Sequence, residues 1–224
     1  AASMLVLPHG LYFGRLERRK GVELLIDTSQ LLLARGLNVS VLFIGGDTPT
    51  GPGNRSMLAH LRSRVAERWR DRFQFEGPRP RQDIFNLVRG VTESGGVCCF
   101  PSIWENFPNV CLEAMSLGAT VVGSDAGGMS EIIEDGVSGL LFRSGDSGSL
   151  DTAITRALQD DDLRRSIATS APRRIAALCH PATVVDQMTA TIETARVAPK
   201  RSLEPRNRTT RTMSQSIKRL AAKA

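Results

Sequence analysis

Two glutamates flank the start of a helical pattern in PSIWENFPNVCLEAMSLG, residues 101–118. Glu105 and Glu113 lie eight positions apart with Pro108 between them. Proline fits the first turn of a helix and discourages helical geometry at the residue before it. We therefore expect Glu105 to lie in a loop and a helix to begin near Pro108, with Glu113 inside that helix. A carboxylate that accepts two hydrogen bonds suits a vicinal diol such as ribose, and Glu105 could face a reacting sugar.

The start of the same helix offers backbone donors. The amides of Asn109 and Val110 would point out of the helix N-terminus, which attracts anions through its unpaired N–H groups and its dipole. Glutamates are common near helix starts for the same electrostatic reason, so the pair alone indicates little.

A second stretch, GRLERRKG at residues 14–21, is rich in basic residues. Arg15 follows a strand-like segment, and Lys20 lies at the start of the next helical pattern. Two cations at the carboxyl end of a strand can neutralise a diphosphate. We interpret Arg18 and Arg19 instead as solvated charges.

Short apolar strand patterns alternate with longer helical patterns along the chain. The expected strands are 10–15, 39–46, 73–77, 96–102, 120–125 and 138–143. Helices are expected between these strands, including a charged helix that ends near Arg70. Further helices are expected after the last strand, to about residue 195. This alternation predicts an α/β fold, a Rossmann-like parallel sheet with helices on both faces.

Polar and glycine-rich segments follow the expected strands. They are residues 14–15, 45–47, 77–79, 101–109 and 124–128. In a parallel sheet all of them should meet at one edge, where ligands bind at the topological switch point.

Composition and charge divide the chain into a body and a tail. With 224 residues and 41% hydrophobic residues, the chain suits one large domain or a domain plus a tail. No apolar run approaches the roughly 20 residues of a membrane helix, and the first residues lack a signal-peptide pattern. Residues 199–224 hold eight Lys/Arg and one Glu, a net charge of +7, so the rest of the chain has a net charge of −1 and the total of +6 comes from this segment.

We therefore expect a linker or truncated N-terminus at 1–9, a domain at 10–197 and a basic, disordered tail at 198–224. The tail could contact an acidic membrane surface, whereas the near-neutral body gives no reason to expect nucleic acid. The four cysteines, Cys98, Cys99, Cys111 and Cys179, show no metal-binding spacing. They are interpreted as reduced, buried thiols of a cytoplasmic protein.

Three motifs, taken together, resemble the glycosyltransferases of family 4, which have the GT-B fold. The pattern G-R-L-x-x-x-K-G is matched at 14–21, and P-S-x-x-E-x-F-x-x-x-x-x-E-A-M is matched at 101–115. The pattern G-x-x-V-V-x-S-D-x-G-G-x-x-E-I-I-x-D-G-x-x-G-L-L is matched at 118–141. The resemblance covers about residues 10–195, so the chain is similar to the C-terminal, donor-binding half of such an enzyme.

The resemblance implies roles for individual residues. Arg15 and Lys20 would bind the diphosphate of a nucleotide-sugar donor, Glu113 would hold the ribose, and Glu105 would be the catalytic residue beside the transferred sugar. The other donor-binding residues would be Gly77 and Arg79 near the base, and Asn106, Phe107, Pro108, Asn109 and Val110 near the distal phosphate and sugar. Many relatives have glycine in place of Asn106 and Pro108, which bears on the identity of the sugar.

The resemblance also implies a retaining transfer from a UDP- or GDP-linked sugar to an acceptor hydroxyl, without a metal or other cofactor. The run of aspartates at 160–162 is interpreted as a helix N-terminus and not as a metal site. The family's N-terminal domain holds the acceptor and usually a catalytic histidine, for which the chain offers no counterpart. That domain would be supplied in cis or as a separate chain. The expected setting is polysaccharide or glycoconjugate synthesis, in the cytoplasm or at the inner face of the membrane.

Other functions are compatible with parts of the pattern. A nucleotide-sugar epimerase shares the GT-B fold, and a non-enzymatic nucleotide-binding or scaffold module would need no second domain. A glycosidase pair is disfavoured because Glu113 lies inside a helix and the cations would have no task. A dinucleotide oxidoreductase is disfavoured because the first strand is followed by G-R-L and not by G-x-G-x-x-G.

Overall fold

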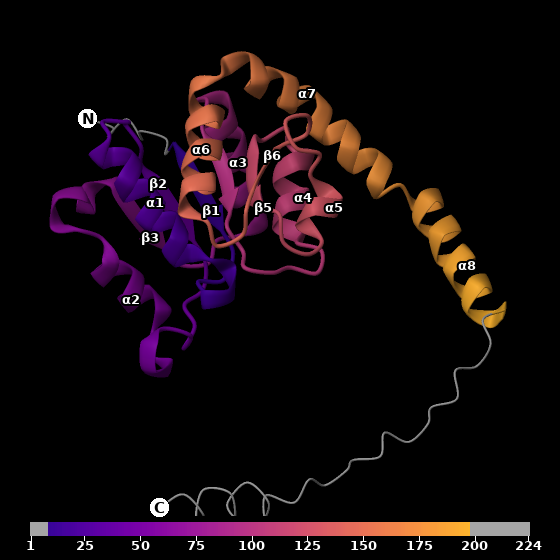
Figure 1. Cartoon of the computed structure of the whole chain (residues 1–224), viewed down its shortest axis with the longest axis horizontal. Helices are drawn as coiled ribbons and strands as arrows, with labels where there is room; N and C mark the ends of the chain where they lie inside the picture. The colour runs from indigo at the N-terminus through magenta and orange to yellow at the C-terminus, as the bar shows by residue number, and fades with distance from the viewer. Residues whose placement is uncertain (1–8, 198–224) are drawn as a thin grey trace, which may run out of the picture. The chain divides into compact units, whose positions relative to one another are not determined.

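The computed structural model describes residues 9–197 (Figure 1). The predicted tail at 198–224 and all but the last residue of the predicted linker lie outside the described residues. The chain divides into two compact units, 1–184 and 185–224. This division falls inside the last described helix, so the expected domain limit at residue 197 stays a prediction. Within the described part of the chain, no helix is both long enough and apolar enough to cross a bilayer.

Six parallel strands form one sheet in the order β3-β2-β1-β4-β5-β6 (Figure 1). They are β1 (Gly10–Phe13), β2 (Val41–Ile44), β3 (Phe73–Glu76), β4 (Val97–Phe100), β5 (Val121–Ser124) and β6 (Leu140–Phe142). The register places Tyr12 beside Phe43 and Leu11 beside Cys98. This order is that of a Rossmann-like fold. The predicted fold class is therefore confirmed.

Helices cover the sheet on both sides. The helices of the described residues are α1 (Val22–Ala34), α2 (Met57–Arg64), α3 (Arg81–Glu93), α4 (Asn109–Ser116), α5 (Met129–Ile132), α6 (Ser147–Gln159), α7 (Asp161–Leu178) and α8 (Pro181–Val197), with 3-10 turns η1 (Arg18–Lys20), η2 (Pro52–Asn54) and η3 (Glu67–Arg72). Helices α1 and α6 pack against each other on one face, and α3 and α4 pack together on the other (Figure 1). Because both faces are covered, strands such as β2 and β4 are buried throughout.

One predicted helix is shorter than expected. The charged helix expected to reach Arg70 ends at Arg64, and η3 follows after a break. Val65 adopts extended geometry and is buried, and the N–H of Ala66 donates to Oε1 of Gln30 at 2.7 Å. Burial of one side chain and capture of the next amide by α1 therefore interrupt the helix.

Aromatic side chains form the centre of the core. Tyr12, Phe43 and Phe100 are almost fully buried, and the ring of Tyr12 lies 5.8 Å from that of Phe43 between centroids. Three of the four cysteines are buried as expected. The interpretation is wrong for Cys179, which is exposed because it follows the last turn of α7.

Candidate functional site

Two loops meet at the carboxyl edge of the sheet. Strands β1 and β4 are neighbours in the sheet, although they are far apart in the sequence. The N–H of Ile103 donates to the carbonyl of Arg19 at 2.8 Å. A Cβ atom on Gly21 would lie 1.8 Å from the carbonyl oxygen of Pro101, so only glycine permits this approach. The segments after β1 and β4 are thus in backbone contact at the switch point, where such folds bind ligands.

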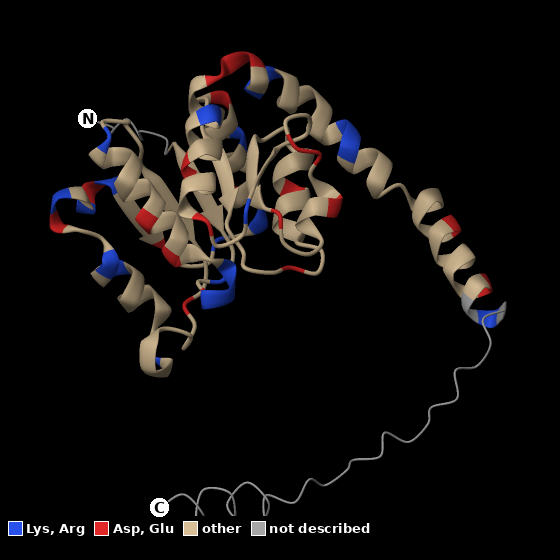
Figure 2. Ribbon diagram, in the orientation of Figure 1, with Lys and Arg blue, Asp and Glu red and all other residues tan. Residues whose placement is uncertain are grey.

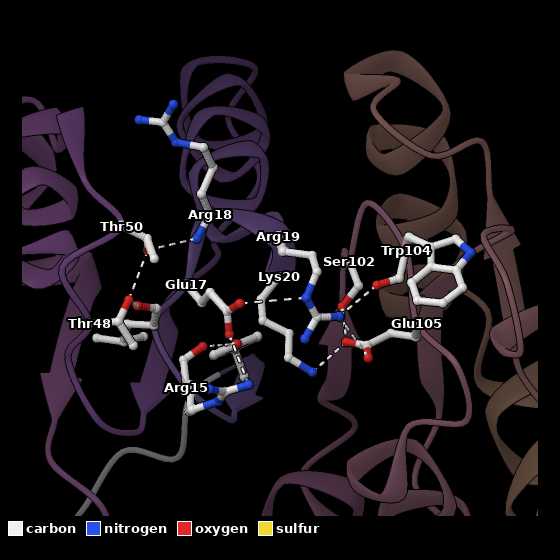
Figure 3. A network of polar contacts seen from close by, with 12 residues as sticks. Arg15, Glu17, Arg18, Arg19, Lys20, Thr48, Thr50, Ser102, Trp104 and Glu105 are labelled. Carbon is white, nitrogen blue, oxygen red and sulfur yellow. Dashed lines mark hydrogen bonds and ion pairs between the residues drawn. The ribbon is translucent and has the colours of Figure 1, made fainter. Parts of the chain in front are cut away.

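The carboxylate of Glu105 lies at the centre of this contact (Figure 3). Only 7% of the residue is exposed. Its carboxylate pairs with Nζ of Lys20 and accepts hydrogen bonds from Nη1 of Arg19 at 3.1 Å and from Oγ of Ser102 at 2.8 Å. The same Arg19 nitrogen also donates to the carbonyl of Trp104 at 2.8 Å. The expected loop position of Glu105 is therefore confirmed.

The interpretation of Arg19 as a solvated charge is wrong. The 3-10 turn η1 directs Arg19 and Lys20 to the same carboxylate, whereas the side chain of Arg18 points away from it (Figure 3). Figure 2 shows this turn as a basic segment at the end of the sheet. No pattern in a run of three basic residues distinguishes the middle one, because the distinction depends on the geometry of the turn.

The charge of Glu105 follows from its surroundings. Burial raises the pKa of Glu105, but hydrogen bonds from Lys20, Ser102 and Arg19 outweigh it and hold the pKa below the ordinary value. The bond to Glu105 in turn raises the pKa of Arg19. The carboxylate is therefore ionised at neutral pH, which suits electrostatic stabilisation of a positively charged group better than proton donation.

Arg15 lies beside this cluster, directly after β1. Its side chain is 66% exposed, and Nη2 pairs with Oε2 of Glu17 at 3.1 Å. Its carbonyl accepts a hydrogen bond from the hydroxyl of the buried Tyr12 at 2.7 Å. The backbone of Arg15 is thus fixed to the core while its charge faces solvent.

Helix α4 begins next to the cluster. Pro108 is its N-cap, in extended geometry, and makes no side-chain capping bond. The carbonyl of Pro108 accepts from the amides of Cys111 and Leu112. Among the described residues, the amides of Asn109 and Val110 have no hydrogen-bond acceptor, so they can serve an anion. The expected helix start is confirmed, and proline precedes the first helical residue.

The loop between β4 and α4 rests on two glycines that follow β5. The N–H of Gly128 donates to the carbonyl of Glu105 at 2.9 Å. A Cβ atom on Gly128 would lie 1.7 Å from the carbonyl oxygen of Asn106, and one on Gly127 would lie 2.1 Å from that of Glu105. The motif at 118–141 therefore packs against the motif at 101–115 through these two glycines. The sequence predicted that both motifs lie at this edge of the sheet, but it did not indicate that they are in contact.

Gly77 and Arg79, which are expected near the nucleotide base, lie in the loop after β3, the first strand in the sheet order. Gly77 follows β3, and a Cβ atom there would meet nothing within 4 Å. Arg79 pairs with Glu76, with Nη2 2.5 Å from Oε2. This loop leads into α3, whose first residue, Arg81, contacts Glu113 with Nη2 3.0 Å from Oε1. Arg81 was not expected from the sequence to take part in the site.

An open hollow adjoins the cluster. Its volume is about 520 Å³, and it is lined by Glu17, Arg18, Arg19, Ile103 and residues of the 49–54 loop. Thr50 holds that loop against η1 by accepting from the N–H of Arg18 at 3.1 Å. A ligand of moderate size could therefore reach the side chains of Arg18 and Arg19 through this hollow.

No group of three or more metal-binding side chains occurs within residues 9–197. The acidic run at 160–162 caps α7, since Asp160 accepts from the N–H of Leu163 at 2.9 Å. Asp162 pairs with Arg165 on the same helix. The interpretation of this run as a helix N-terminus is confirmed.

Comparisons with known proteins agree on the class of protein that this architecture represents. Residues 8–160 match the family model described as glycosyl transferases group 1. The chain is similar to the D-inositol 3-phosphate glycosyltransferase of Corynebacterium urealyticum, with 30% identity over 74% of this chain and 38% of that protein. It is similar to the alpha-D-kanosaminyltransferase of Streptomyces kanamyceticus, with 29% identity over 73% of this chain and 40% of that protein.

A solved structure shows the same arrangement of elements. HepE of Anabaena, in complex with UDP, superposes with a TM-score of 0.68 and 27% identity, covering 83% of this chain and 48% of that one. The chain spans about two fifths of the length of the two curated relatives and about half of the length of the solved chain.

Proposed function

Since this chain belongs to the glycosyl transferases of group 1, we propose that it supplies the donor-binding half of a retaining, family 4 hexosyltransferase. The enzyme would move a sugar from a nucleoside diphosphate to an acceptor hydroxyl. The observation that carries the proposal is the meeting of Arg19, Lys20 and Glu105 at the switch point, next to the start of α4.

The charges at this point fit the reaction. When the nucleoside diphosphate departs, negative charge builds on its phosphate while the sugar becomes cation-like. Lys20, Arg15 and the free amides at the start of α4 would stabilise the phosphate, and the ionised Glu105 would face the cationic sugar. Groups held in place before the reaction favour this charge-separated state over the ground state.

The nucleoside would lie towards α3 and α4. Glu113 would accept hydrogen bonds from the ribose hydroxyls, with Gly77 and Arg79 near the base. HepE of Anabaena was solved in complex with UDP, which supports a nucleoside diphosphate as the carrier. We propose UDP or GDP as the carrier.

The acceptor would be held by a second domain, in cis or as a separate chain. This proposal is supported by the share of the relatives that the chain spans, 38% and 40%. We further propose a metal-independent reaction in the cytoplasm, in polysaccharide or glycoconjugate synthesis. The three buried thiols suit a reducing compartment.

Calorimetric titration with UDP, GDP, ADP and their sugars, with and without EDTA, tests the proposal. We expect one nucleotide to bind equally well in both conditions. Glu113→Gln should weaken that binding by about tenfold, the effect of a lost charge-assisted hydrogen bond. Glu93→Gln, an exposed position at the end of α3, is the matched control.

Three outcomes would contradict parts of the proposal. A folded chain that binds no nucleotide would exclude an autonomous donor site. Binding that EDTA abolishes would exclude the metal-free site. Binding that tolerates Glu113→Gln would favour the scaffold alternative.

A further inference from the structure

Glu17 lies between two cations of the site. It is the fourth residue of GRLERRKG, a position that the family pattern leaves open. Its Oε2 atom is 3.1 Å from Nη2 of Arg15, and its Oε1 atom is 3.5 Å from Nε of Arg19 (Figure 3). The carboxylate therefore faces both guanidinium groups at once.

The position of this carboxylate is fixed by the fold. Glu17 is the N-cap of η1 in extended geometry, and its carbonyl accepts from the N–H of Lys20 at 2.9 Å. Its side chain is only 17% exposed. A glutamate on the surface of a helix would exchange among many conformers, whereas this one is held beside its partners.

We infer that Glu17 competes with the donor's diphosphate for Arg15 and so restrains the affinity of the site. The inference rests on the proposed function. Arg15 is the more exposed of the two partners of Glu17, at 66% against 37% for Arg19. It is therefore the guanidinium that a ligand can reach and take from the carboxylate.

The balance of charge supports this competition. The three cations Arg15, Arg19 and Lys20 pair with two carboxylates, so the net charge of this group is one positive unit. The carboxylates are those of Glu17 and Glu105. A nucleoside diphosphate carries at least two negative charges. Glu105 is also bonded to Ser102 and is nearly buried, so it stays in place. Glu17 is then the carboxylate that opposes the incoming anion.

The competition has a consequence for the reaction cycle. The nucleoside diphosphate product carries more charge on its phosphates than the donor sugar does. A carboxylate that recaptures Arg15 helps this product to leave, and product release limits the rate of many enzymes. Glu17 would thus favour turnover over tight binding.

The test compares Glu17→Gln with the unaltered chain by calorimetry. The ligands are the diphosphates UDP, GDP and ADP, and the monophosphate UMP for comparison. We expect the variant to bind the preferred nucleoside diphosphate about three- to tenfold more tightly, as one opposing charge a few ångström away implies when water screens the interaction. The gain should be smaller for UMP, or for the matching monophosphate, which carries less charge. Glu67→Gln removes the same charge from another arginine-paired glutamate, on η3, and should leave Kd within about twofold.

The outcomes separate this inference from the proposed function. If the unaltered chain binds a nucleoside diphosphate and Glu17→Gln binds it no more tightly, the inference is overturned and the function stands. Weaker binding by the variant would show that Glu17 orients Arg15 for the phosphate. If neither protein binds any of the nucleotides, an autonomous donor site is excluded, and the inference about Glu17 fails with it. Binding by the variant alone would support both. Circular dichroism of each variant confirms that it is folded.

Discussion

Nη2 of Arg81 and Oε1 of Glu113 lie 3.0 Å apart and join the first residue of α3 to α4. The pair brings the loop after β3 to the carboxylate that we assign to ribose. The guanidinium of Arg81 also lies over the ring of Phe85, which limits its movement. We therefore expect Arg81 to hold the carboxylate of Glu113 in position.

Arg81→Gln should lower nucleotide affinity by about threefold, because a carboxylate that is no longer held must be ordered by the ligand. The free energy of unfolding should change by less than about 1 kcal/mol, since the side chain of Arg81 is 71% exposed and solvent screens its pairing with Glu113. Calorimetry and urea denaturation measure the two effects. Arg89→Gln, at an exposed position on the same helix, is the control. Tighter binding by the Arg81 variant would instead mean that Arg81 competes with the ribose.

Glu105→Gln should destabilise the chain by about 1–3 kcal/mol at pH 7. The side chain of Lys20 is largely buried, and the substitution removes its anionic partner. The loss should depend on pH. The folded-state pKa of Glu105 lies below its ordinary value of 4.5, so its contribution is present above pH 4.5 and is lost as pH falls through the folded value.

Urea denaturation of both proteins at pH 7 and pH 3 checks this dependence. Carboxylates elsewhere, such as Asp47, titrate equally in both proteins and cancel in the difference. The gap between the two unfolding free energies should narrow at pH 3. A gap that is the same at both pH values would refute an ionised, ion-paired Glu105.

Gly127→Ala should disturb the loop that carries Glu105, since the new Cβ atom would meet the carbonyl of Glu105. We expect a loss of about 3 kcal/mol in the free energy of unfolding, with weaker nucleotide binding. Gly145→Ala is a matched control, because its φ of +77° resembles the +61° of Gly127 but its Cβ atom would meet nothing within 4 Å. It should cost only the backbone term of about 1–2 kcal/mol. Equal losses in the two variants would show that the close approach has no importance.

Cys179 should be the one thiol of the four that reacts rapidly with Ellman's reagent in the native chain. Burial raises the pKa of Cys98 to about 12 and also raises those of Cys99 and Cys111, so the reactive thiolate is scarce at these positions. Urea should release the remaining three thiols, and Cys179→Ser should abolish the rapid phase. A rapid phase of two or more thiols would mean that the core around β4 opens readily.

Much of the fold was predictable because its signals are local. The apolar runs at 41–44 and 97–100 indicate strands buried on both faces, and alternation with helical periods implies a parallel sheet. The start of α4 followed from Pro108, because the constraint of proline acts on the residues next to it. The end of α2 did not follow, because Val65 leaves the helix to reach the core, which is a tertiary preference.

The sequence by itself determined the type of sheet, the edge at which the motifs gather and the residue types available there. Only the tertiary structure decided that β1 lies beside β4, and hence that Lys20 and Arg19 meet Glu105 across 85 and 86 positions of the chain. The physical reason is range. Helix and strand preferences arise between residues a few positions apart, whereas an ion pair depends on distances of a few ångström that the strand order and the turn η1 create.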